Sequence, residues 1–174
     1  MAVKRLRIDA VASGFREIEM VDALVGRELG HVIPALDAGL DADTGQYFVV
    51  MARAERSLRS LLDDRGSIAE AHVTEILEAI AVGLLEIEDV IHRDLKPDDV
   101  LYHNGVWKLA DSGIARFTED ATSTNTMRDC LSPPYAAPEQ WRGEHATHAT
   151  DVYAVGITAF ELLTGHPPFR WPTA

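Results

Sequence analysis

The chain has 174 residues, of which 47% are hydrophobic and 25% are charged, so it is long enough to bury one sizeable core. A formal net charge of −12 argues against a nucleic-acid binder and against attraction to anionic membranes, because both normally need a basic surface. The single cysteine, Cys130, excludes an internal disulfide, and no apolar run approaches the ~18 residues of a membrane span. We therefore expect a protein of the reducing cytoplasm.

The N-terminal region predicts a strand followed by a helix. Residues 1–8 alternate weakly between apolar and basic side chains, which favours a short strand that carries Lys4. Ser13 is a suitable N-cap, and apolar residues at helical spacing follow it. The next segment, with Glu17 and Glu19, is therefore predicted to be a helix with one apolar face.

Two further strands and two further helices are predicted before the middle of the chain. The segments Val32–Gly39 and Tyr47–Met51 favour strands, and residues 41–45 favour a turn between them. Ser57–Asp64 predicts a short helix that ends at the following glycine. The segment from Ser67 to about Glu86 predicts a long amphipathic helix. Its apolar stripe consists of Val73, Ile76, Leu77, Ile80, Leu84 and Ile87.

A loop dense in charge occupies residues 92–99. It lies between two apolar pairs, Val90-Ile91 and Val100-Leu101, which we expect to form two brief strands. The loop brings acidic side chains, basic side chains and a proline into close succession. Loops held by a rigid scaffold commonly carry catalytic residues, so this loop is the leading candidate for a functional site.

A β-hairpin is predicted directly after this loop. Asn104-Gly105 is the strongest two-residue hairpin signal, because both turn positions need positive φ. Such a turn pairs residue 99 with residue 110 and returns Asp111 beside Asp98 and Asp99. Carboxylates gathered in this way repel one another unless a cation lies between them, and Mg²⁺ prefers such oxygen ligands. Strict alternation would place Asp99 and Asp111 on opposite faces, so the ladder must bend or end before them.

The C-terminal part predicts a polar loop and a buried helix. Residues 117–130 are rich in hydroxyl side chains and favour a mobile loop. The segment from Asp151 to Leu163 is apolar nearly all round, which is typical of a central helix with partners on every side.

The charged loop, His92-Arg93-Asp94-Leu95-Lys96-Pro97-Asp98-Asp99, resembles the catalytic loop H-R-D-L-K-P-x-N of eukaryotic-type (Hanks-type) serine/threonine protein kinases. The resemblance implies that Asp94 accepts the proton of the attacking hydroxyl and that Lys96 contacts the transferred phosphate. It also implies a metal-holding role at Asp99, where the family has Asn.

Segments on the N-terminal side fit the nucleotide site of the same family. Ala2-Val3-Lys4 resembles the V-A-[IV]-K strand, which implies that Lys4 holds the α- and β-phosphates of ATP. The family pairs this lysine with a helix glutamate. The spacing to the later segment Gly30-His31-Val32-Ile33-Pro34 favours Glu17 over Glu19 as that residue.

The strand Tyr47–Met51 leads into the segment that resembles the kinase hinge, residues 52–54. The resemblance implies that Met51 lies at the back of the adenine pocket, although a methionine there is equally consistent with plain core. It further implies that the backbone of Ala52 and Ala54 binds the adenine ring.

Segments on the C-terminal side also fit. Asp111-Ser112-Gly113 stands where the family has D-F-G, which implies that Asp111 is the main metal ligand. Ser112 is a departure, because serine cannot fill the space of the family phenylalanine. The segment from Ser132 to Glu139 resembles [ST]-P-x-Y-x-A-P-E and implies a serine or threonine substrate. Asp151 opens a stretch that resembles D-V-[YW]-[AS]-x-G, whose aspartate holds the catalytic-loop backbone.

The resemblance implies an α+β, two-lobe kinase-like fold, partial at both ends. Residues 1–51 would form a remnant of the small lobe, with a few antiparallel strands and one helix. Residues 52–54 would be the hinge, and residues 55–174 a truncated, mainly helical large lobe. Neither the Gly-rich phosphate loop nor the last helices of the large lobe is recognisable in the sequence. We therefore expect a partner or a further segment to cover the apolar central helix.

The implied function is ATP-dependent transfer of the γ-phosphate, with ATP and Mg²⁺ as cofactors, to a serine or threonine of a protein substrate. The alternative is a pseudokinase-like binding module or a non-functional kinase fragment. The absent Gly-rich loop, Ser112 and Asp99 motivate that alternative.

Overall fold

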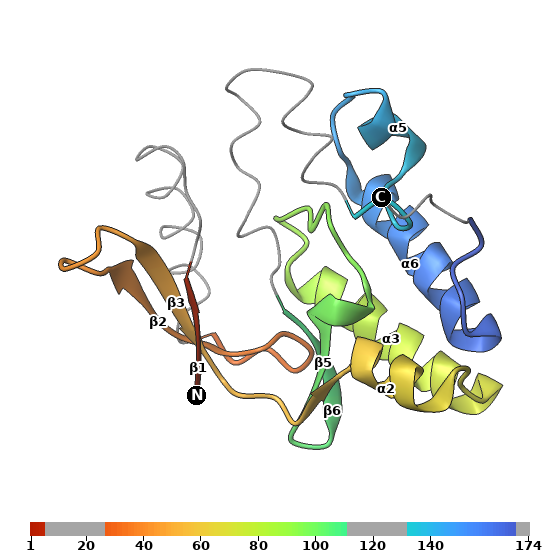
Figure 1. Cartoon of the computed structure of the whole chain (residues 1–174), viewed down its shortest axis with the longest axis horizontal. Coiled ribbons are helices and arrows are strands. Elements are labelled where there is room, and N and C mark those ends of the chain that lie inside the picture. The colour runs from red at the N-terminus through yellow and green to blue at the C-terminus, as the bar shows by residue number, and fades with distance from the viewer. Residues whose placement is uncertain (6–26, 111–131, 170–174) are drawn as a thin grey trace.

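Figure 1 shows the computed structural model of the chain, which describes residues 1–5, 27–110 and 132–169. These residues form two small antiparallel sheets and a group of helices, which confirms the predicted α+β class. The strands are β1 (Ala2–Arg5), β2 (Ala35–Leu40), β3 (Tyr47–Met51), β4 (Arg56–Ser57), β5 (Val100–His103) and β6 (Val106–Leu109). The helices are α2 (Leu58–Arg65), α3 (Glu70–Glu86), the 3-10 turn η1 (Pro97–Asp99), α5 (Pro138–Trp141) and α6 (His148–Thr164). The predicted helix with Glu17 lies outside the described residues.

The first sheet has the strand order β1-β3-β2 and stands apart from the labelled helices α2, α3, α5 and α6 in Figure 1. Lys4 lies opposite Val49 and Ala2 lies opposite Met51 in its ladder. Val49 is fully buried at the centre of a small apolar cluster. Strand β3 matches its prediction, whereas β2 begins at Ala35 rather than at Val32.

The late start of β2 has a tertiary cause. The backbone of the preceding segment pairs with the second sheet instead, since Ile33 N donates to Leu109 O (2.7 Å) and Leu109 N donates to His31 O (2.7 Å). Val32 and Ile33 are buried there. The segment thus joins the first sheet to the main core.

The second sheet, β4-β5-β6, contains the predicted hairpin. His103 lies opposite Val106 and Leu101 lies opposite Lys108, as a two-residue turn requires. Asn104 has φ 52° and Gly105 has φ 83°, so both turn residues adopt the left-handed conformation that the Asn-Gly signal predicts. The pairing of the short β4 with β5 was not predicted.

The helices largely follow the sequence pattern. Ser57 caps α2 by accepting a hydrogen bond from Ser60 N (3.1 Å), and Gly66 ends the helix at φ 76°. Helix α3 begins at Glu70 rather than at Ser67, because Ile68 N donates to Leu162 O (2.7 Å) and Ile68 is buried in the core. The predicted strand at residues 90–91 is wrong: Val90 N closes a turn on Ile87 O (2.8 Å).

Burial of α6 is one-sided. Ala154, Ile157 and Leu162 face the core, while Val152 and Leu163 are 66% and 49% exposed. The prediction that this helix is buried on every side is therefore wrong for the described residues, because the core covers only one of its faces. None of the helices within the described ranges combines the length and the apolar character that crossing a membrane requires.

The backbone of the segment that precedes β2 packs very closely against helix α3. A Cβ at Gly83 would lie 2.7 Å from His31 O, so only glycine allows this approach. One turn further on, the Glu86 carboxylate accepts hydrogen bonds from the N–H groups of Gly30 and His31, each at 2.8 Å. Glycine and glutamate therefore dock the backbone of residues 30–31 onto the helix.

We expect Gly83→Ala to lower the free energy of unfolding by about 1–3 kcal/mol, because the new methyl group overlaps with backbone that cannot rotate away. Gly156→Ala in α6 is the matched control, since no described atom outside its own helix lies within 4 Å of that Cβ position. Alanine there should raise stability by about 1 kcal/mol through helix propensity. Urea unfolding of both variants measures the difference, and equal stability of the two would contradict the close approach.

Candidate active site

Three side chains meet at the charged loop. Lys96 Nζ donates to Asp94 Oδ2 (2.8 Å) and to Ser132 Oγ (3.0 Å). Ser132 N in turn donates to Asp94 Oδ1 (3.3 Å). The side chains of Asp94 and Lys96 are each 25% exposed, so both are within reach of a bound molecule. The structure thus brings two predicted catalytic residues together with a hydroxyl from a segment 36 positions away.

The charge on Lys96 is set by its acidic neighbours. Partial burial lowers the pKa of Lys96, but the hydrogen bond with Asp94 and the negative charges of Asp99, Asp94 and Asp98 outweigh this effect. Its pKa is therefore raised above the ordinary value, and the group remains an ammonium ion throughout the neutral range. A fixed positive charge next to Asp94 suits the binding of a phosphate.

The loop backbone is held from α6, as predicted for Asp151. Its Oδ2 accepts a hydrogen bond from His92 N (2.9 Å), and its Oδ1 accepts one from Arg93 N (2.8 Å). The ring of His92, 2% exposed, contacts Ala110 O through Nε2 (3.0 Å). The start of the loop is thereby attached both to the central helix and to the end of β6.

Asp99 is nearly buried and lies in η1, immediately before β5. Its Oδ2 is 3.8 Å from Lys96 Nζ, and its carbonyl oxygen accepts a hydrogen bond from Ala110 N (2.8 Å). The paired strands end at Val100 and Leu109, so the ladder stops before Asp99. Asp111 itself lies outside the described residues. Within residues 1–5, 27–110 and 132–169, no group of three or more metal-ligating side chains occurs.

The predicted nucleotide residues that the structure describes lie on or next to the first sheet. Because side chains alternate between faces, the pairs Lys4–Val49 and Ala2–Met51 place Lys4 and Met51 on the same face. At the hinge, Ala52 N donates to Pro34 O (3.0 Å). The carbonyl of Ala52 and the backbone of Ala54 make no hydrogen bond to another described residue, and Glu17 lies outside the described ranges.

The model of the protein kinase domain family matches residues 1–173 of this chain. The chain belongs to the protein kinase family. Among curated relatives, the probable serine/threonine-protein kinase PknB of Corynebacterium glutamicum is 37% identical to this chain over 181 aligned positions. The alignment covers 98% of this chain and 28% of that protein. The chain is 35% identical over 181 positions to the serine/threonine-protein kinase PrkC of Bacillus subtilis, covering 100% of this chain and 28% of the relative. The serine/threonine-protein kinase PknL of Mycobacterium tuberculosis is 38% identical over 148 positions, which cover 82% of this chain and 36% of the relative. The chain thus spans about a third or less of the length of these relatives.

The kinase domain contains a partly buried ionic network, centred on the buried Glu161, that sequence reasoning missed. Arg59 of α2 donates to Glu161 Oε1 (3.0 Å) and to Tyr135 OH (2.5 Å), and Tyr135 OH donates to Glu161 Oε2 (2.5 Å). Arg59 Nε also lies 3.6 Å from Asp98 Oδ2 in the loop. Burial and the hydrogen bond to Glu161 raise the pKa of Tyr135, so the phenol stays neutral. No sequence signal identifies this network, because Tyr135 and Glu161 lie 76 and 102 positions from Arg59.

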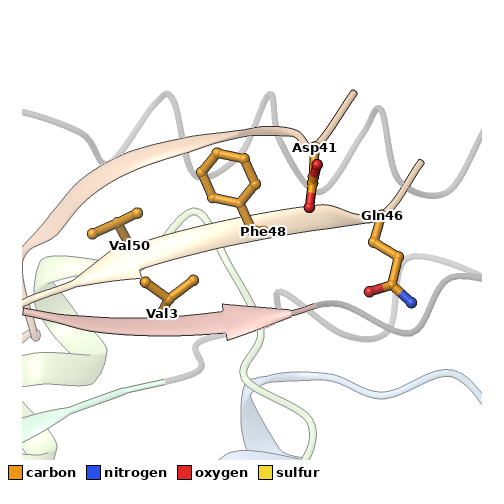
Figure 2. Close-up of a pocket in the computed structure, with 5 residues that line it drawn as sticks. All are labelled: Val3, Asp41, Gln46, Phe48 and Val50. Carbon is orange, nitrogen blue, oxygen red and sulfur yellow. The ribbon is translucent and has the colours of Figure 1, made fainter. Parts of the chain in front are cut away.

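A hollow of about 290 Å³ lies on the first sheet of the kinase domain. Figure 2 shows its lining residues Val3, Phe48 and Val50, with Asp41 and Gln46 at one end. Val3 alternates with Lys4, so this hollow faces away from the predicted nucleotide side. It is therefore distinct from the site around Asp94.

Proposed function

We propose that the chain transfers the γ-phosphate of Mg-ATP to a serine or threonine hydroxyl of a protein substrate in the cytoplasm. The observation that carries this proposal is the contact among Asp94, Lys96 and Ser132, three residues that occupy matching positions in two separate kinase motifs. The relatives named above are serine/threonine-protein kinases by their names, which supports the same substrate class.

Each residue has a defined role in the proposed reaction. The substrate oxygen attacks the γ-phosphorus, the bond to the ADP oxygen breaks, and Asp94 takes the proton that the hydroxyl loses. The ammonium group of Lys96 stabilises negative charge on the transferred phosphoryl group. Ser132, through its contacts with both side chains, maintains their mutual orientation.

We propose that Asp99 and Asp111 hold the magnesium ion. Asp99 offers carboxylate oxygen, the ligand type that Mg²⁺ prefers, and it lies one residue before β5 and next to Lys96. When bound, the ion would neutralise charge on the phosphates. On the nucleotide side we assign Lys4 with Glu17 to the phosphates, and Met51, Ala52 and Ala54 to the adenine.

The test is transfer of labelled γ-phosphate from Mg-ATP by the purified chain to a basic generic protein, which suits the net charge of −12. We expect label on serine or threonine of the substrate, and we expect removal of the metal with EDTA to abolish it. A folded chain that transfers no phosphate under these conditions would overturn the proposal.

The second candidate is a nucleotide-binding module without transfer activity. Two departures from the family pattern favour it, Asp99 in place of Asn and Ser112 in place of Phe. Isothermal titration with Mg-ATP separates the candidates, because binding without transfer identifies the module. Asp99→Asn then restores the family residue, and a gain of transfer in that variant would identify Asp99 as the cause of inactivity.

A further inference from the structure

The peptide that precedes the proposed base has an unusual conformation. Arg93 has φ 67°, a left-handed conformation that is unfavourable for a residue with a long side chain. Asp94 follows directly, so the orientation of the Arg93–Asp94 peptide decides where the Asp94 carboxylate points. A conformation of this kind persists only when its surroundings hold it in place.

Two buried side chains hold this backbone, one at the N–H group of Arg93 and the other at its carbonyl oxygen. Asp151 of α6 accepts the N–H of Arg93 (2.8 Å), and Gln140 of α5 donates from Nε2 to the carbonyl oxygen of Arg93 (2.8 Å). The Asp151 contact was expected from the sequence, whereas no motif assigned a role to Gln140.

The orientation of the Gln140 amide follows from its two partners. Its Oε1 accepts a hydrogen bond from Ala137 N (3.0 Å), while its Nε2 faces Arg93 O. The reverse orientation would set oxygen against oxygen and N–H against N–H. Gln140 is 8% exposed, so water does not readily replace either partner.

We propose that Gln140 is a positioning residue for the transfer reaction, an inference that rests on the proposed function. It fixes the carbonyl of the strained Arg93 and thereby directs the Asp94 carboxylate. Because Gln140 also holds Ala137 N, it links the segment that begins at Ser132 to the catalytic loop. The position of this segment is thus coupled to the position of the base.

The test compares Gln140→Glu with Gln140→Met. The carboxyl group of the Gln140→Glu variant can donate to Arg93 O only while it carries a proton. We expect its kcat to be at least about tenfold below wild type at high pH and to approach wild type as the pH falls through the pKa of that buried carboxyl group. The Gln140→Met variant has no hydrogen-bond donor at this position, so its kcat should be lowered by the same factor at every pH. The KM for ATP should not change in either variant.

Gln46→Glu, an exposed substitution of the same chemical kind, is the control and should follow wild type at every pH. Equal pH profiles for wild type and Gln140→Glu, in chains with equal thermal stability, would overturn the inference.

A second measurement does not depend on activity. Amide hydrogen exchange of the peptide around residues 92–96 should become severalfold faster in Gln140→Met, while exchange within α3 stays unchanged. If wild type transfers no phosphate but this exchange response appears, the proposed function fails and the positioning contact stands. Unchanged exchange around residues 92–96 would contradict the contact itself.

Discussion

Asp94→Asn is expected to lower kcat for phosphate transfer by about 10²–10⁴-fold, the usual contribution of a positioned general base. Asparagine has the same shape, and its oxygen can still accept one of the hydrogen bonds that Lys96 Nζ and Ser132 N donate to Asp94. It cannot take up the hydroxyl proton. The KM for ATP should therefore change little, and steady-state kinetics with Mg-ATP would separate the two parameters.

Asp98→Asn is the matched control for this prediction. Asp98 lies in the same loop, but its side chain is 51% exposed and its carboxylate pairs with Arg59 at 3.6 Å instead of contacting Lys96 at hydrogen-bond distance. We expect its kcat to remain within about twofold of wild type, since exposed ion pairs contribute little. If Asp94→Asn and Asp98→Asn had the same small effect, Asp94 would not be the base.

Arg59→Ala is expected to lower the free energy of unfolding by about 3–5 kcal/mol, the range found when one partner of a buried ion pair is removed. The Glu161 side chain is only 4% exposed, and Arg59 donates to both of its oxygens. Without the guanidinium, Glu161 must keep an uncompensated buried charge or take up a proton. Tyr135 also loses its contact with Arg59. Urea unfolding followed by circular dichroism would measure the loss.

The chain offers an internal comparison for this effect. Arg142 and Glu144 form a similar Arg–Glu contact (2.7 Å), but their side chains are 60% and 54% exposed. Arg142→Ala should therefore leave the unfolding curve unchanged within error, because water screens such pairs. Arg59→Lys should recover only part of the loss, since an ammonium group lacks the fork that reaches both Glu161 oxygens and Tyr135. Equal unfolding curves for Arg59→Ala and Arg142→Ala would contradict a structural role of the buried network.

Local features of this protein could be predicted from the sequence. The Asn104-Gly105 turn has both φ values positive, and α2 begins after Ser57 and ends at Gly66. These features depend on the conformational preferences of a few adjacent residues. Such preferences act locally and do not depend on the rest of the fold. The charged loop was also identified, because its residue types stand in a fixed order within eight positions.

Other features were decided only by the tertiary structure. The backbone at Ile33 pairs with Leu109 rather than continuing β2, and Ile68 bonds to Leu162 rather than starting α3. Gln140 reaches Arg93 across 47 positions, and Arg59 reaches Glu161 across 102. A single sequence contains no local signal for such contacts. These contacts form only when packing of the core brings the distant segments together. A buried polar group must then form its hydrogen bonds with the neighbouring backbone or side chains, because water cannot reach it.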